Sequence, residues 1–247
     1  MFQDHFSGHA EGDARHRPGY PAALFTWLAQ SAPARGWAWD CATGNGQAAR
    51  GLAAHFSRVV ATDGSRRQIA QARPHPRIRF GVALAEHAPL AEASMDLVTV
   101  AQALHWFQRP AFWNEARRVL RPGGVLAVWT YGLPAVCPAV DAVIRHLYGE
   151  LLADFWPPER RLVEGGYRDI GFPFPELPAP AFRLAAHWTL AQLLGYLSTW
   201  SAVHRCRRAT GDDPLAAIAG PLAQAWGPAG RRRGIRWPLV LRAGARP

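Results

Sequence analysis

A glycine-rich segment flanked by two acidic residues most constrains what this chain can fold into. Asp40 leads into a loop that holds Gly44 and Gly46, and a short apolar run after it ends at Asp63. This order predicts a strand, a tight loop, a helix and a second strand that ends in a carboxylate. Glycines let the backbone approach a ligand closely, and an acid at the second strand end can bind ribose hydroxyls. The segment predicts a nucleoside-binding βαβ unit; the alternative is an ordinary α/β turn with an unrelated acid.

The details of the loop distinguish between two kinds of nucleoside ligand. A dinucleotide site has the pattern G-x-G-x-x-G, but Ala49 stands at the third glycine position. Asp40 at the edge of the loop would also repel a pyrophosphate, since like charges in a partly dry site cost energy. A carboxylate there favours a ligand with cationic groups, such as the ammonium and sulfonium of S-adenosylmethionine. An NAD(P)-dependent oxidoreductase is the alternative reading.

Three segments carry a resemblance to a known family. Residues 40–46 resemble the first motif of class I S-adenosylmethionine-dependent methyltransferases, usually D-x-G-x-G-x-G. Ala42 replaces the first glycine, which should be tolerated if the backbone there has a negative φ. Residues 84–96 and 118–126 resemble later motifs of the same family, in the same order. The resemblance covers about residues 15–130 and implies S-adenosylmethionine as the cofactor.

Residues 17–21 and 104–107 are similar to a narrower group, the type 11 methyltransferases related to trans-aconitate methyltransferase. The resemblance implies a Rossmann-like α/β fold: a seven-stranded, mostly parallel sheet with strand 7 antiparallel and helices on both faces. It also implies a small-molecule acceptor that is methylated at oxygen or carbon, a carboxylate being one candidate.

Alternating apolar and helical patterns predict the elements. We predict strands at residues 37–40, 59–63, 78–82, 97–101, 125–130, 182–188 and 237–242. We predict helices at residues 22–29, 47–55 and 112–120, the last ended by Pro122 and Gly123, and a helix from Thr189 to about Arg205. Ser65 is expected to cap a helix, and Thr189 with Gln192 to form a capping box. We expect one domain over residues 1–247, with helical cap insertions at residues 131–181 and 189–230.

The cofactor residues are expected at the carboxyl ends of the strands, where open α/β sheets bind ligands. Asp63 is the candidate for the ribose, and Asp40 for orienting the loop and facing the methionine amine. The Ala85 backbone is expected beside the adenine, whereas the role of Glu86 is open. The full predicted set is Asp40, Ala42, Gly44, Gly46, Asp63, Ala85, Glu86 and Gln102.

The acceptor side is expected to involve His105 and Trp106, which follow the fourth strand. His105 is a candidate general base, or else a packed histidine. Trp106 is a candidate for a cation–π contact with the sulfonium, or else core filler. Arg17 and Tyr20 are expected to close over the methionine end or the acceptor.

Tyr196, Trp200 and His204 are spaced to share one face of a single helix. We take Tyr196 and Trp200 as candidates for lining the acceptor pocket. Core packing is the alternative reading of this aromatic stripe.

Charge and cysteine content limit the partners. The net charge is +10, but every basic residue is arginine and none is lysine, which indicates compositional bias rather than a phosphate-binding face. Nucleic acid is therefore not an expected partner, although a non-enzymatic nucleotide- or RNA-binding protein stays an alternative. The cysteines at 41, 137 and 206 lie far apart, which predicts no metal site and a reducing, cytoplasmic location. Residues 123–140 lack charge but are broken by prolines, so no membrane span is expected. The oligomeric state is left open.

Overall fold

The computed structural model describes residues 17–247 of the 247-residue chain. Residues 15 and 16, at the start of the predicted core, lie outside the described part. Seven strands form one sheet in the order β3-β2-β1-β4-β5-β7-β6. The strands are β1 Trp37–Cys41, β2 Arg58–Asp63, β3 Ile78–Val82, β4 Met95–Ala101, β5 Leu120–Tyr131, β6 Phe182–Trp188 and β7 Arg233–Ala245.

The strand directions confirm the predicted fold class. The pairs β1–β2, β2–β3, β1–β4 and β4–β5 are parallel, whereas β7 runs antiparallel to both β5 and β6. The strand order reverses between β1 and β4. A reversal of this kind opens a crevice at the carboxyl ends of the strands, where ligands bind in such sheets.

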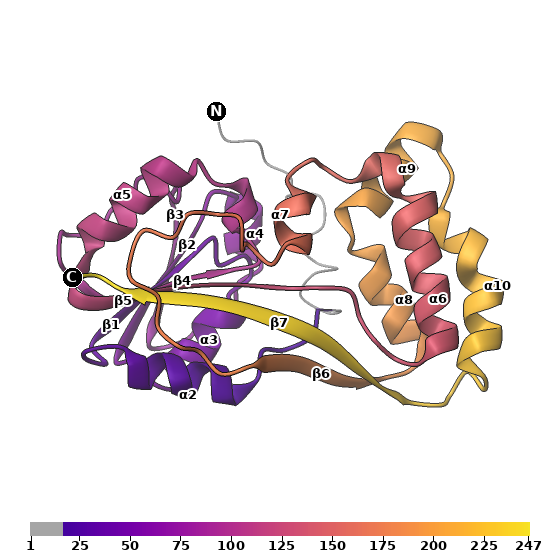
Figure 1. The fold of residues 1–247 in the computed structure, drawn as a ribbon, viewed down its shortest axis with the longest axis horizontal. Helices are drawn as coiled ribbons and strands as arrows, with labels where there is room; N and C mark the ends of the chain where they lie inside the picture. Colours follow the sequence, from indigo (N-terminus) through magenta and orange to yellow (C-terminus); the bar gives the residue numbers. More distant parts are fainter. Residues whose placement is uncertain (1–16) are drawn as a thin grey trace.

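Alternate residues of the strands divide the core between the two faces of the sheet. Leu97, Val125 and Ala127 pack on one face with α2 and α3, while Val98 and Leu126 pack on the other with α5. Figure 1 shows α2 and α3 below the sheet and α5 on its other side. These helices are α2 Ala22–Ser31, α3 Gln47–Ala53, α4 Arg66–Ala70 and α5 Arg109–Val119.

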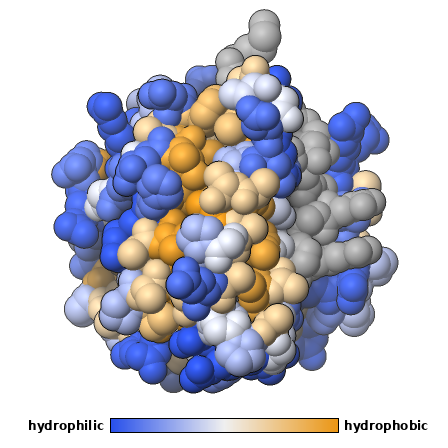
Figure 2. All heavy atoms as spheres, turned by 90° about the vertical axis from the view of Figure 1, so that its right-hand side faces the viewer, coloured by the Kyte–Doolittle hydropathy of each residue, from blue (hydrophilic) through white to orange (hydrophobic). Residues whose placement is uncertain are grey.

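Four further helices form a lobe beside the sheet (Figure 1). They are α6 Pro138–His146, α8 Leu190–Ser198, α9 Ser201–Thr210 and α10 Pro214–Trp226, with short turns η2 Leu147–Leu151 and η3 Ala153–Phe155. The short helix α7 Arg160–Glu164 lies between the sheet and the lobe, where it contacts the turn η1 Leu104–Trp106 that follows β4. Figure 2 looks onto the outer face of this lobe, where apolar side chains form a band between hydrophilic flanks. Arg207 on α9 pairs with Asp213 at 2.9 Å, so this part of the arginine-rich run is engaged within the lobe.

The predicted bounds of one helix and of the last strand were wrong at both ends. The helix predicted at 112–120 starts earlier, at Arg109, because Pro110 fits its first turn. It also ends earlier, since Leu120 is already extended and begins β5, which includes Pro122 and Gly123. β7 begins at Arg233 and runs to Ala245, beyond the predicted 237–242 at both ends.

The helix predicted from Thr189 to about Arg205 is two helices. The capping box of Thr189 and Gln192 is present at the start of α8, as predicted. Trp200 then adopts an extended backbone with φ −67° and ψ 132°, which separates α8 from α9. Tyr196 and His204 consequently lie on different helices, and the prediction of one shared helix face was wrong.

Within residues 17–247, the longest helices are too short or too polar to span a bilayer.

Candidate functional site

A cavity of about 890 Å³ opens at the carboxyl ends of the parallel strands. Its walls come from the loop after β1, the end of β2, the loops after β3 and β4, and the segment at residues 158–162. Ligand sites commonly measure roughly 300–1,000 Å³, so the cavity has room for a cofactor and a small second molecule. Among the predicted site residues, those that line it are Arg17, Tyr20, Ala42, Gly44, Asp63, Ala85, Glu86, Gln102, His105 and Trp106.

The loop after β1 bends back on itself through left-handed residues. Ala42 has φ +54°, so the condition of a negative φ, under which an alanine would be readily tolerated here, is not met. A left-handed alanine costs about 1–2 kcal/mol, and the hydrogen bond from Thr43 N to Thr62 O helps to hold the loop there. At Gly46, φ is +91° and a Cβ would come within 2.8 Å of the Phe80 ring. Gly46 therefore has to be glycine.

Asp40 lies beneath this loop rather than in the cavity. Its side chain is fully buried and accepts hydrogen bonds from Thr43 at 2.5 Å and from Thr99 at 2.8 Å. Burial raises its pKa from 3.8 to about 6, although these hydrogen bonds oppose the shift. The structure therefore supports the predicted role in orienting the loop, and Asp40 is absent from the cavity wall among the described residues.

Asp63 joins two loops at the edge of the cavity. Its Oδ2 accepts from Gly44 N at 2.9 Å, and its Oδ1 accepts from Ser65 N at 2.8 Å. Ser65 in turn caps α4, as predicted. A carboxylate at this strand end is the group that accepts hydrogen bonds from ribose hydroxyls in nucleoside sites of this kind.

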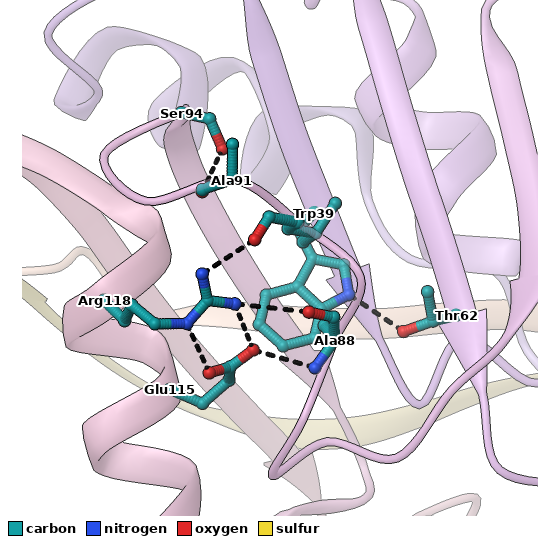
Figure 3. A network of polar contacts seen from close by, with 8 residues as sticks. Trp39, Thr62, Ala88, Ala91, Ser94, Glu115 and Arg118 are labelled. Carbon is teal, nitrogen blue, oxygen red and sulfur yellow. Dashed lines mark hydrogen bonds and ion pairs between the residues drawn. The ribbon is translucent and has the colours of Figure 1, made fainter.

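The loop after β3 is clamped by α5 (Figure 3). Glu115 Oε1 accepts from Ala88 N at 2.8 Å, and Arg118 donates to Leu90 O at 2.7 Å while pairing with Glu115. Trp39 lies beside this clamp and donates to Thr62 at 2.9 Å. The clamp fixes the backbone that presents Ala85 to the cavity.

Glu86 and Leu84 of this loop both line the cavity, but only Glu86 is held by a side-chain hydrogen bond among those described. Glu86 Oε1 accepts from Gln108 N at 2.9 Å, which ties the β3 loop to the β4 loop. Leu84, which sequence reasoning did not place in the site, lines the cavity while 43% exposed. An exposed leucine directly after a strand is the signal that could have identified it.

Gln102 stands at the end of β4 with φ +55°. Its Oε1 accepts from Thr130 at 2.7 Å and from Tyr131 N at 2.8 Å. The side chain therefore anchors the end of β4 to β5, while the residue borders the cavity. Strained residues such as this one persist where the surrounding structure fixes them, which occurs often at functional sites.

His105 is a buried residue of η1 that lines the cavity. Nδ1 lies 2.9 Å from the Tyr167 hydroxyl, and the Trp106 ring lies 4.7 Å away between centroids. Burial, and then the positive charge of Arg160, lower the pKa of His105 to about 3. The imidazole is therefore neutral at neutral pH. Trp106 also lines the cavity.

Tyr20 and Arg17, from the N-terminal part of the described chain, line the cavity. The Tyr20 ring packs edge-on against Trp129 at 5.5 Å, and burial raises the Tyr20 pKa to about 12.

Tyr196 and Trp200 lie elsewhere. They pack in the lobe core, Tyr196 against Trp188 and Trp237, and neither is among the described residues that line the cavity. The core-packing reading fits both.

Of the residues predicted to form a cap, one segment lines the cavity among those described. Glu159 and Arg161, at the start of α7, line the cavity, whereas α8, α9 and α10 contribute no lining residue among those described. Residues 189–230 were expected to cap the site; they pack instead against α6 and η2. Sequence reasoning missed Glu159 and Arg161 because the proline-rich stretch around them carries no periodicity.

The site fits S-adenosylmethionine in its donor and acceptor groups. Asp63 offers acceptors for ribose hydroxyls, Leu84 and Ala85 offer an apolar surface for a flat ring, and Asp40 places a carboxylate beneath the loop. Among the described residues, the cavity wall has no glycine-rich loop of the dinucleotide type that would bind a pyrophosphate. Ala49 occupies the position of the third glycine and is buried in α3.

Comparisons with known proteins agree with this geometry. A family model described as a methyltransferase domain matches residues 39–128. A Dictyostelium discoideum protein assigned as a methyltransferase is 31% identical over 229 residues, which cover 91% of this chain and 87% of the relative. A solved structure assigned as a type II methyltransferase of Anaeromyxobacter dehalogenans is 54% identical, with a TM-score of 0.87, and the match covers 93% of this chain and 97% of that chain.

A more distant structure shows the fold alone. It is phosphoethanolamine N-methyltransferase 2 of Haemonchus contortus in complex with phosphomonomethylethanolamine and S-adenosylhomocysteine, 14% identical with a TM-score of 0.52; the match covers 98% of this chain and 58% of that chain. Sequence motifs, fold, cavity and relatives thus agree, and the chain belongs to the class I S-adenosylmethionine-dependent methyltransferases.

Proposed function

We propose that the protein methylates a small organic acceptor, at oxygen or carbon, inside the cavity at the carboxyl ends of the strands. The observation that carries this proposal is that one cavity joins the cofactor loop to Glu159 and Arg161 of α7. The cavity is partly enclosed and of a size for a cofactor and a small molecule. The narrower resemblance to trans-aconitate methyltransferase supports the same acceptor class.

The residues of the loops hold the cofactor. Asp63 accepts hydrogen bonds from the ribose, the Ala85 backbone and the Leu84 side chain contact the adenine, and the loop of Gly44 approaches the methionine part. When bound, S-adenosylmethionine supplies an electrophilic methyl group on a sulfonium. The protein then has to bind, align and dry the two reactants. Trp106 offers a ring to the sulfonium, a contact worth about 0.5–2 kcal/mol.

Charged side chains of both signs line the cavity outside the cofactor loops. Arg17 and Arg161 line it, as does Glu159, and a guanidinium binds a carboxylate through two parallel hydrogen bonds. We therefore propose an acceptor that carries an anionic group, bound by one of these arginines.

A product assay tests the proposal. Purified protein is incubated with S-adenosylmethionine and a panel of small hydroxy acids, dicarboxylates and phenols, and the S-adenosylhomocysteine released is measured. We expect release with at least one acceptor, abolished in Asp63→Ala and retained in Asp212→Ala, whose exposed carboxylate lies on the lobe. Cofactor binding without turnover of any small molecule, but with methylation of protein or RNA, would overturn the small-molecule assignment.

A further inference from the structure

One residue at the start of α7 contacts the lobe while its neighbours line the cavity. Glu159 and Arg161 belong to the part of the cavity wall at residues 158–162, here called the acceptor wall, whereas Arg160 is absent from the wall among the described residues. Arg160 stacks instead on aromatic rings of the lobe. The group that holds it, here called the Arg160 clasp, consists of Tyr148, Trp156, Trp200 and Glu164. We propose that the clasp positions α7, and with it the acceptor wall, for binding the acceptor. This inference rests on the proposed function and adds positioning residues that lie outside the cavity.

Arg160 is held by cation–π contacts and by a hydrogen bond. Its guanidinium carbon lies 4.7 Å from the centre of the Trp156 ring and 5.3 Å from the centre of the Tyr148 ring. Its Nε donates to the Tyr148 hydroxyl at 2.8 Å. Cation–π contacts form within about 6 Å of a ring centre and strengthen where water is excluded, and Arg160 is half-buried. Together these contacts fix both the place and the orientation of the guanidinium.

The Tyr148 hydroxyl joins the two ends of α7. It accepts from Arg160, the first residue of the helix, and donates to Oε1 of Glu164, the last residue. Residues four apart lie on the same face of a helix, so this face of α7 is turned toward the lobe. Each residue advances by about 100° around the axis, which turns Arg161 and Leu162 away from the lobe face. Both of these residues line the cavity.

The clasp is supported by the packing of the lobe. The rings of Tyr148, Trp156 and Trp200 contact one another, with centroids 4.6, 5.6 and 5.8 Å apart, and Trp156 Nε1 donates to Tyr148 O at 3.0 Å. Tyr148 belongs to η2, a π-type turn closed by a hydrogen bond from Leu152 N to Leu147 O. Such turns are rare and often occur at functional sites. Trp200, a sequence candidate for lining the acceptor pocket, thus contacts the clasp and not the cavity.

The length of α7 makes contacts with the rest of the molecule necessary. Its five residues are too few for a helix that is stable by itself. Val163 packs in the core on the α5 face of the sheet and holds the middle of the helix. Within residues 17–247, the side chains of Glu159 and Arg161 make no hydrogen bond or ion pair. Their positions therefore follow the backbone of α7, whose first residue the clasp holds.

A clasp that served only the packing of the lobe would have different consequences. Loss of such a contact would lower the free energy of unfolding and leave the kinetics of the enzyme at their wild-type values. Loss of a contact that positions the acceptor wall weakens the use of the acceptor, while the cofactor loops after β1, β2 and β3 keep their places. Kinetic constants for the acceptor and binding constants for the cofactor therefore separate the two roles.

Steady-state kinetics with an acceptor found in the product assay test the inference. In Arg160→Gln we expect kcat/KM for the acceptor to fall roughly tenfold to a hundredfold, the scale of loss when a site shifts by about 1 Å. Calorimetric binding of S-adenosylhomocysteine should equal that of the wild-type protein. Tyr148→Phe keeps the ring and removes only the hydroxyl, so its loss should be smaller. Arg145→Gln, the same change at an exposed position of α6, is the control and should match the wild-type protein.

A double variant distinguishes positioning from general damage. Arg161→Gln removes a charged group of the acceptor wall itself. If Arg160 acts through this wall, the loss of kcat/KM in the variant that carries both changes should be smaller than the product of the two single losses, because coupled residues are not additive. A loss equal to that product, or weaker binding of S-adenosylhomocysteine in Arg160→Gln, would overturn the inference.

Hydrogen exchange tests the clasp without an acceptor. In the purified protein, we expect the backbone of residues 159–164 to exchange faster in Arg160→Gln and in Tyr148→Phe than in the wild-type protein, with the strands of the sheet unchanged. Equal exchange at α7 in both variants would overturn the inference. If the wild-type protein releases no S-adenosylhomocysteine with any acceptor, the proposed function fails instead, and the exchange result still decides whether the clasp holds α7.

Discussion

At the scale of single residues, burial shifts the pKa values of two ionisable groups of the site in opposite directions. Asp40 has a raised pKa and His105 a lowered one. Both shifts change the free energy of unfolding with pH, because the folded and unfolded states bind different numbers of protons. Their effects oppose each other in mildly acidic solution, so single variants reveal them better than the wild-type protein does.

Asp40 should destabilise the fold as pH rises. Its pKa is 3.8 in the unfolded chain and about 6 in the fold, so the penalty is absent below pH 4 and complete above pH 6. The shift corresponds to about 3 kcal/mol at most. We expect Asp40→Asn to gain stability relative to wild type across this window. Urea unfolding at pH 4, 5, 6 and 7 measures the difference; a difference independent of pH would contradict the assignment.

His105 should destabilise the fold as pH falls. The unfolded chain takes up a proton near pH 6.5, whereas the buried imidazole, with a pKa of about 3, does not. The penalty begins below pH 6.5 and reaches roughly 2 kcal/mol at pH 5. Relative to wild type, His105→Gln should therefore gain stability from pH 7 to pH 5. His55→Gln, at a partly exposed histidine on the far side of α3, is the control; an equal gain in both variants would argue against a buried neutral His105.

Several residue roles could be predicted from the sequence, and others could not. Asp63 and Gly46 were identifiable because their chemistry and spacing are local. The positive φ of Ala42 was not, since it depends on how the loop meets Thr62 of the next strand. Tyr196 and His204 show the same limit: their spacing fits one helix face, but a break at Trp200 places them on different helices.

At the scale of elements, the loop after β3 depends on α5. Glu115 accepts the buried N–H of Ala88 and holds Arg118. Glu115→Ala leaves that N–H unpaired, which costs about 1–3 kcal/mol, and frees the loop that presents Leu84 and Ala85. We expect lower stability and weaker binding of S-adenosylhomocysteine, measured by thermal unfolding and calorimetry. Glu92→Ala, at an exposed position of the same loop, should change neither the stability nor the binding of S-adenosylhomocysteine. Unchanged binding in Glu115→Ala would show that the clamp does not position the loop for the cofactor.

Element types were more predictable than their ends. All seven predicted strands exist, because each is a short apolar run between turn residues. The helical segments around residues 138–164 and 201–226 were not located individually. Buried residues nevertheless recur on one face of these helices, at Val140 and Ile144 of α6 and at Leu215, Ile218 and Leu222 of α10. This helical spacing is a signal that could have located them.

At the scale of the whole molecule, one wall of the cavity comes from the loops at the strand ends and the other from the segment around α7. The order of motifs along the chain fixes the strand order, since parallel strands joined by helices follow right-handed crossovers. The cofactor wall of the cavity was therefore predictable. The acceptor wall was not, because it depends on how α7 and its flanking prolines fold back over the strand ends.

The most direct test of the account is calorimetric titration of the purified wild-type protein and Asp63→Ala with S-adenosylmethionine and with S-adenosylhomocysteine. We predict that the wild-type protein binds both with one site per chain, and that Asp63→Ala binds at least about tenfold more weakly, the loss expected when charge-assisted hydrogen bonds of about 1.5–3 kcal/mol are removed. Folded wild-type protein that binds neither compound, or Asp63→Ala that binds both as tightly as wild type, would contradict the placement of the cofactor in this cavity.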